Sequence, residues 1–186
     1  MIQEKRYSGD KILLFDVDHT LLISNAKIEV TDQKTGKKFE LTPEEFNDYQ
    51  KHQDHLVNFD QFSSLEIMKA GQLINKYFNI LKKNYKKGIA IGIVTARADR
   101  DMIYDFFRYH VGFHIDRPLV WAVNDPEHGL TGSIQERKKQ ALRWFVEQGY
   151  SDITFFDDDK NNLKLAKELD REIPEIKIKT HLVKYK

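Results

Sequence analysis

The sequence predicts an α/β fold, in which a parallel sheet is flanked by helices and a small cap is inserted after the first strand. Short apolar runs alternate with amphipathic helical patterns, which is typical of βαβ units. Roughly seventy residues separate the first strand-like run from the second, far more than a crossover connection needs. Three strand-like runs also end in carboxylate or hydroxyl side chains. These observations predict both the fold class and the edge of the sheet that carries the chemistry.

The predicted strands are short, apolar and bounded by polar residues. The second of them ends at Thr95, and the last begins with an alternating pattern that suits the edge of a sheet. The expected strands lie in residues 11–17, 88–97, 118–124, 152–159 and 176–183.

Helical patterns fill the intervals between these strands. The run 99–110 has Asp99 as a candidate N-cap, and the run 133–149 begins with the Ser-x-x-Glu of a capping box and ends at a glycine. A shorter helix is expected at 160–169, before Pro174.

The long interval after the first strand has its own pattern. Residues 26–42 contain two β-like runs around "QKTG", which predicts a hairpin. Thr42 and Pro43 are good starting residues for a helix over 42–56, and a longer helix over 63–86 leads back to the sheet. We therefore expect a core of residues 1–23 and 85–186, with a small cap and a crossover helix in 24–84.

The composition fits one domain of ordinary size with an insertion. The chain has 186 residues, of which 40% are hydrophobic and 32% charged, enough for both a core and a solvated surface. A net charge of +1 gives no overall electrostatic reason to bind nucleic acid. The absence of cysteine excludes disulfides, thiolate metal ligands and thiol catalysis. No run resembles a signal peptide or reaches the ~18 apolar residues of a membrane span. We expect a soluble, cytoplasmic protein without membrane partners.

Carboxylates at the strand ends are the main chemical signal. In "KILLFDVDHTLL", the first strand runs directly into Asp16 and Asp18, and the strand "DITFFDDD" ends in residues 157–159. Buried like charges repel, so something must offset the cost of bringing them together. The carboxyl ends of parallel strands meet at one edge of a sheet, where Thr95 is also expected. Hard oxygen ligands in that arrangement predict a Mg²⁺ site that accepts phosphate oxygens.

The motifs resemble those of the haloacid dehalogenase (HAD) superfamily. "DVDHT" matches its Asp-x-Asp-x-Thr motif, and Thr95 in "IVTAR" matches the hydroxyl residue that ends its second strand. Lys138 matches its motif lysine, with Lys139 as a rival, and the first two acids of "FFDDDKNN" match its acidic pair. The resemblance covers about residues 8–22 and 88–183 and implies a Rossmann-like core with a cap after the first strand.

The resemblance also implies roles for these residues. Asp16 would be the nucleophile that forms an aspartyl-phosphate, and Asp18 the general acid and base. Mg²⁺ would be held by the Asp16 side chain, the Asp18 backbone carbonyl and a carboxylate from Asp157 or Asp158.

Three further residues would contact the substrate. Thr95 would bind a phosphoryl oxygen, and Lys138 would neutralise charge on the nucleophile and the phosphoryl group. Arg97 follows Thr95 closely and is expected at the rim of the pocket, in contact with substrate.

The implied function is a Mg²⁺-dependent phosphomonoesterase, a hydrolase of phosphoric monoesters. The expected substrate is a nucleotide, a nucleic-acid end such as a 3′-phosphate, or another small phosphate ester. "VTARADRD" and the small cap also resemble phosphatases of tailed phages and the phosphatase half of polynucleotide kinase-phosphatase, which would imply host cytoplasm. The alternatives are a phosphotransferase or mutase on the same fold, and a non-catalytic module that binds nucleic acid or protein. No obligate protein partner is evident.

Overall fold

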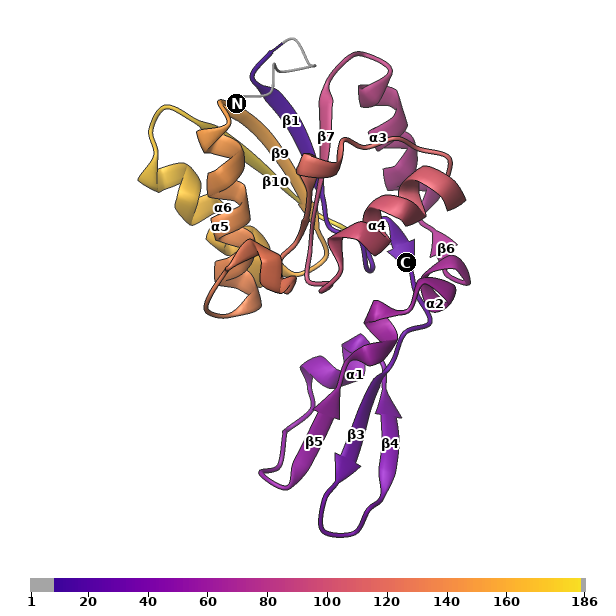
Figure 1. Cartoon of the computed structure of the whole chain (residues 1–186). Coiled ribbons are helices and arrows are strands. Elements are labelled where there is room, and N and C mark those ends of the chain that lie inside the picture. The colour runs from indigo at the N-terminus through magenta and orange to yellow at the C-terminus, as the bar shows by residue number, and fades with distance from the viewer. Residues whose placement is uncertain (1–8, 185–186) are drawn as a thin grey trace. The chain divides into compact units, whose positions relative to one another are not determined.

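The computed structural model describes residues 9–184, which form two compact units (Figure 1). One unit is Ser24–Gly71, and the other contains the rest of the described chain. Each unit is described by itself below. The helix that leads into the second sheet strand belongs to the sheet unit, because the inserted unit ends at Gly71 rather than at residue 84.

The sheet unit contains a five-stranded parallel sheet in the order β10-β9-β1-β7-β8, so the predicted α/β fold is confirmed. The first strand along the chain is the central one, with β7 and β8 on one side and β9 and β10 on the other. This reversal of order beside β1 creates the kind of switch point where open α/β sheets bind ligands. The strand bounds are β1 Lys11–Phe15, β7 Ala90–Thr95, β8 Val120–Ala122, β9 Asp152–Asp157 and β10 Lys177–Leu182.

Helices cover both faces of this sheet. Helices α3 (Asn75–Tyr85) and α4 (Arg100–Asp105) lie on one face, whereas α5 (Ile134–Glu147) and α6 (Lys160–Glu172) lie on the other (Figure 1). This division follows from right-handed crossovers that run first toward β8 and later toward β10. Because both faces are covered, the central strands are largely buried: β7 is buried at every position.

Close packing between β7 and its neighbours requires a glycine. A Cβ atom built on Gly92 would lie 2.7 Å from Leu14 Cδ2 and 3.3 Å from Phe145 Cζ, and 3.0 Å from the Leu119 carbonyl oxygen. The glycine therefore lets β1, β7 and α5 approach each other closely.

Two predicted helix starts are confirmed. The Ser133 hydroxyl accepts a hydrogen bond from the Glu136 backbone N–H, and the Glu136 carboxylate accepts one from the Ser133 N–H, which completes a capping box. Asp99 caps α4 by accepting from the Met102 N–H.

The helical run after Asp99 continues beyond α4 as a π-helix, Phe106–His110. The third predicted strand is shorter than expected, because Arg117–Leu119 forms a 3₁₀ turn before β8.

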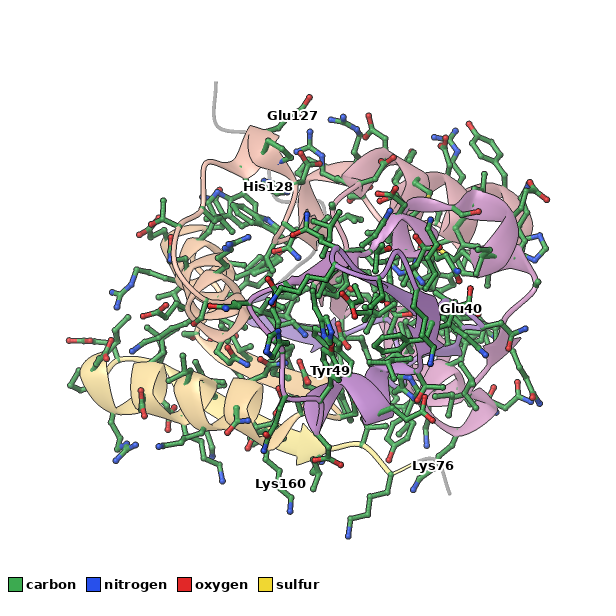
Figure 2. All side chains as sticks on the ribbon, turned by 90° about the horizontal axis from the view of Figure 1, so that it is seen from below. Glu40, Tyr49, Lys76, Glu127, His128 and Lys160 are labelled. Carbon is green, nitrogen blue, oxygen red and sulfur yellow. The ribbon has the colours of Figure 1, made fainter. Side chains whose placement is uncertain are left out.

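The inserted unit is built on a three-stranded antiparallel sheet in the order β4-β3-β5. Strands β3 (Ile28–Asp32) and β4 (Lys38–Leu41) form the predicted hairpin, and β5 (His55–Asn58) pairs with the other edge of β3. The unit also holds α1 (Pro43–Asn47), a 3₁₀ turn (Asp60–Ser63) and α2 (Leu65–Lys69). A group of aromatic rings packs around Tyr49, labelled in Figure 2, which contacts Phe39, Phe46 and His55.

Two helix predictions in this region are wrong. The helix expected over 42–56 starts as predicted, with Thr42 as N-cap and Pro43 as its first residue, but it ends at Asn47, and the last of the expected residues belong to β5. The helix expected over 63–86 is interrupted: α2 ends at Lys69, β6 (Gln72–Leu73) follows, and only then does α3 begin. Strand β6 pairs in antiparallel fashion with β2 (Leu22–Ile23), so the chain leaves and re-enters the sheet unit through adjacent segments.

No helix within residues 9–184 combines the length and apolar character needed to cross a membrane.

Candidate active site

The candidate site lies at the carboxyl edge of the parallel sheet. Phe15, the last residue of β1, is in register with Ile93 of β7 and Phe156 of β9. The residues that follow these positions, Asp16, Thr95 and Asp157, therefore reach the same edge. The Asp16 backbone N–H donates to the Phe156 carbonyl at 2.9 Å, which extends the strand pairing up to the first carboxylate.

Three carboxylates gather at this edge. Asp16, Asp157 and Asp158 each offer an oxygen atom, and these atoms all lie within 4.8 Å of one another. Asp157 is fully buried and Asp16 is 5% exposed, whereas Asp158 is half-buried. No other cluster of this kind with three or more acids or histidines occurs in residues 9–184.

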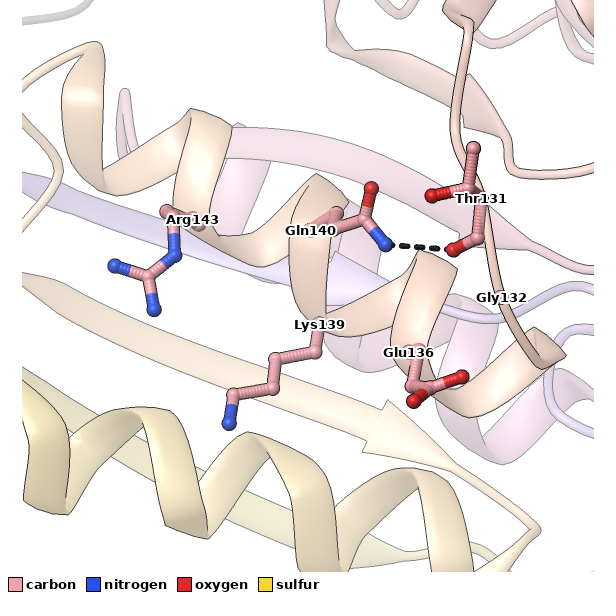
Figure 3. Close-up of a pocket in the computed structure, with 6 residues that line it drawn as sticks. All are labelled: Thr131, Gly132, Glu136, Lys139, Gln140 and Arg143. Carbon is pink, nitrogen blue, oxygen red and sulfur yellow. Dashed lines mark hydrogen bonds between the residues drawn. The ribbon is translucent and has the colours of Figure 1, made fainter.

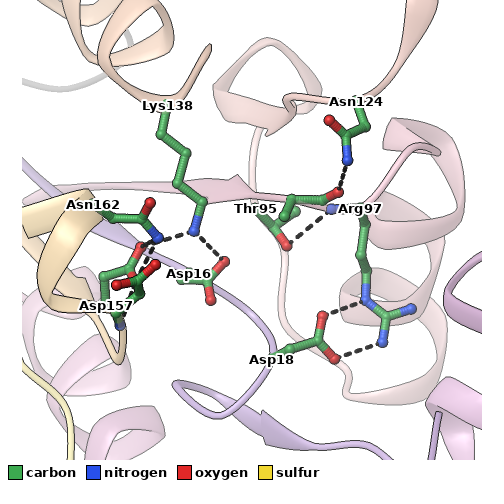
Figure 4. A network of polar contacts seen from close by, with 10 residues as sticks. Asp16, Asp18, Thr95, Arg97, Asn124, Lys138, Asp157 and Asn162 are labelled. Atoms are coloured by element: carbon green, nitrogen blue, oxygen red, sulfur yellow. Dashed lines mark hydrogen bonds and ion pairs between the residues drawn. The ribbon is translucent and has the colours of Figure 1, made fainter. Parts of the chain in front are cut away.

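Lys138 of α5 points between two of these carboxylates (Figure 4). Its Nζ atom lies 3.0 Å from Asp16 Oδ1 and 2.8 Å from Asp157 Oδ2. Burial alone would lower the pKa of Lys138, but the carboxylates of Asp157 and Asp16 outweigh it and raise that pKa, which keeps the amine charged. Lys139, the rival for this position, instead pairs with Glu172 at 2.6 Å on the outer side of α5.

Asp157 is held by several donors. The Asn162 side chain donates to both Asp157 oxygens at 3.0 Å, and the Asp159 backbone N–H donates to Oδ1 at 2.8 Å. Asp159 does not join the cluster; its side chain caps α6 by accepting from the Asn161 N–H. Each acid of "DDD" thus has a different environment.

The electrostatics of the cluster favour an additional cation. Burial raises the pKa of Asp16 well above its ordinary value; Lys138 opposes this effect, whereas Asp157, Asp158 and Asp18 add to it. Burial, followed by the charge of Asp157, raises the pKa of Asp158 to about 6. Both shifts mean that the protein destabilises the ionised carboxylates. A bound cation would stabilise these ionised carboxylates, and hard carboxylate oxygens are the ligands that Mg²⁺ prefers.

Asp18 is turned toward a different partner. Its carboxylate accepts two hydrogen bonds from Arg97, Nε to Oδ2 and Nη2 to Oδ1, each at 2.8 Å (Figure 4). His19, the next residue, has a φ of 57°, a left-handed conformation that reverses the chain directly after Asp18. Arg97 was expected to contact substrate, but in the structure its side chain is buried against Asp18.

The end of β7 is tied to α5 by a residue that the sequence analysis missed. Thr95 is 1% exposed, and its hydroxyl accepts from the Arg97 N–H at 3.4 Å. Asn124 donates its amide to the Ala96 carbonyl at 2.6 Å and accepts from Arg137 Nη1 at 2.6 Å. Its location after the third strand, at the same edge as Thr95, was the available signal.

Two other features lie apart from the acidic cluster. A surface cavity of about 340 Å³ on the outer side of α5 contains none of the cluster residues (Figure 3). It is lined by Thr131, Gly132, Glu136, Lys139, Gln140 and Arg143. The lysine-rich segment 82–87 lies at the opposite edge of the sheet, because it leads directly into the amino end of β7.

Comparison with known proteins gives no relative: no protein-family model matches the sequence, and no curated protein matches it significantly.

Proposed function

We propose that this protein is a Mg²⁺-dependent phosphomonoesterase of the HAD type that acts through an aspartyl-phosphate on Asp16. The observation that carries this proposal is the buried contact of Lys138 with both Asp16 and Asp157, beside three converging carboxylates. A nucleophilic carboxylate, a fixed cation and a set of metal-ligating oxygens are the groups that phosphoryl transfer requires.

The metal would be held by the carboxylates of Asp16, Asp157 and Asp158 and by the Asp18 backbone carbonyl. Bound there, Mg²⁺ would neutralise charge on the phosphoryl oxygens. The Asp18 side chain would not be a ligand, since it is paired with Arg97.

In the first step, an oxygen of Asp16 attacks phosphorus and the bond from phosphorus to the leaving oxygen breaks. Asp18, in its protonated form, gives a proton to that leaving oxygen, and Lys138 and Thr95 bind the phosphoryl oxygens. In the second step, Asp18 takes a proton from water as the water oxygen bonds to phosphorus. The bond between phosphorus and Asp16 breaks, which releases inorganic phosphate and the free carboxylate.

The substrate class follows from the same proposal: a nucleotide, a nucleic-acid end or another small phosphate ester. A panel of 3′-phosphorylated DNA, 5′-phosphorylated DNA, free nucleotides and sugar phosphates, each with Mg²⁺ or with EDTA, separates these choices. We expect release of phosphate from at least one of them, and loss of that release in EDTA.

The matched variants are Asp16→Asn and Asp159→Asn. Asp16→Asn removes the nucleophile and reduces phosphate release to the uncatalysed background. Asp159→Asn changes a neighbouring acid to an equally good helix cap, so the activity remains. Turnover by Asp16→Asn at the wild-type rate would show that Asp16 is not the nucleophile. Activity that persists in EDTA would show that the reaction does not depend on Mg²⁺.

A further inference from the structure

We infer that Arg97 is a positioning residue that acts through Asp18, rather than a residue that binds the substrate. This inference rests on the proposed function, because it assigns Arg97 to the orientation of the general acid and base.

The pairing geometry is the first observation. The guanidinium group contacts the carboxylate with two parallel N–H···O bonds of 2.8 Å, the forked arrangement that fixes both the position and the plane of a carboxylate. A lysine at this position would offer a point charge without that planar match.

Burial is the second observation. The Arg97 side chain is 1% exposed, whereas the Asp18 side chain is 18% exposed. The guanidinium group is therefore enclosed, with two of its nitrogens directed at the Asp18 carboxylate. Asp18 is the more exposed member of the pair, so the pair meets a substrate mainly through Asp18.

The backbone of Arg97 is also fixed by the fold. Its N–H donates to the Thr95 hydroxyl at 3.4 Å, and its carbonyl accepts from the Asn124 N–H at 3.2 Å. Asn124 holds the preceding Ala96 carbonyl and is itself held by Arg137, which is adjacent to Lys138 on α5. The helix that supplies the cation beside the nucleophile therefore also anchors the loop that orients Asp18.

The leaving group provides a test of this role. A 4-nitrophenolate leaves as a stable anion and needs little help from a general acid, whereas an alkoxide needs a proton. Asp18→Asn is therefore expected to reduce kcat/KM for an alkyl phosphate about 10²-fold more than for 4-nitrophenyl phosphate. We expect Arg97→Ala and Arg97→Lys to show the same selective loss, and the double variant Asp18→Asn/Arg97→Ala to lose little more than Asp18→Asn alone.

The matched control is Arg117→Ala. Arg117 pairs with Asp101 at 2.6 Å in a surface contact, so its removal takes away the same kind of ion pair without touching Asp18. It is expected to leave kcat/KM unchanged for both substrates. Arg97→Lys keeps a cation in the buried position and provides the measurement if Arg97→Ala does not fold.

Equal losses on both substrates, additive with Asp18→Asn, would overturn the inference and indicate that Arg97 binds the phosphoryl group directly. That outcome leaves the proposed function intact as long as the wild type releases phosphate in an Asp16-dependent manner. Absence of turnover by the wild type across the substrate panel would instead refute the proposed function itself.

Discussion

Removal of the Lys138 charge is the most direct test of how the acidic cluster is held together. In Lys138→Met, a side chain of similar length replaces an amine that lies 3.0 Å from Asp16 and 2.8 Å from Asp157. Loss of one partner from a buried ion pair costs about 3–5 kcal/mol, because the remaining charge stays buried. Asp157 keeps the donors of Asn162 and the Asp159 N–H, so we expect the lower end of this range, about 3 kcal/mol.

The measurements are urea denaturation and thermal melting at neutral pH in EDTA, both followed by circular dichroism. For a chain of this size, about 3 kcal/mol corresponds to a fall in Tm of roughly 6–12 °C. Saturating Mg²⁺ should restore part of the loss, since it supplies positive charge to the same carboxylates.

Lys139→Met is the matched control. Lys139 pairs with Glu172 in a contact that is partly open to solvent, so its loss is expected to cost less than about 1 kcal/mol. The reasoning would be refuted if Lys138→Met were as stable as the wild type, or if the two variants lost the same amount of stability.

Three further predictions concern the site and the fold. In the absence of metal, the free energy of unfolding should contain a contribution from Asp158 that falls by about 2 kcal/mol from pH 4 to pH 6, because the folded carboxyl keeps its proton until about pH 6 and the unfolded one releases it near pH 3.8. Urea titrations across this range should show that contribution in the wild type but not in Asp158→Asn, and an equal slope in both proteins would contradict the assignment. Gly92→Ala should lower the free energy of unfolding by about 1–3 kcal/mol, because its Cβ would collide with Leu14 and the Leu119 carbonyl. An unchanged Tm would show that these neighbours can move aside for the added methyl group without loss of stability. Ser133→Ala should cost about 1 kcal/mol by removing the cap of α5, measured by thermal melting, whereas Ser133→Asp should retain most of the stability.

The parallel sheet could be predicted because its signals are local and strong. The buried runs at β1, β7 and β9 are mostly apolar, and each ends at a polar side chain or is followed directly by one. The start of α5 was equally clear, because a capping box is written in four consecutive residues. Because Lys138 lies on α5, and Asp16 and Asp157 lie at the ends of neighbouring strands, the same elements bring the amine to the two carboxylates.

The inserted unit was harder to predict. The helix expected over 42–56 was predicted from its start at Thr42 and Pro43, which says little about where it ends, and β5 is a four-residue strand that is identified by its pairing with β3. Gly71 was a visible signal for the break in the helix expected over 63–86, since glycine disfavours a helix interior.

Long-range partners of the site could not be read from local patterns. Arg97 and Asp18 are 79 residues apart, and their pairing depends on the loop after β7 meeting the turn after β1. Asn124 lies at the end of an expected strand, but its partners Ala96 and Arg137 became evident only with β8 in place beside β7. Proximity to Thr95 in the sequence therefore placed Arg97 at the right edge of the sheet, whereas its pairing with Asp18 was not predicted.

The short β2–β6 ribbon has a consequence for how such a protein can change. Leu22 and Leu73 are paired across it, so both ends of the inserted segment meet at neighbouring points of the chain. A segment attached in this way can be shortened, lengthened or replaced during evolution while the register of β1 and β7 stays the same. The inserted unit can therefore change in sequence and length while the acidic cluster at the sheet edge is kept.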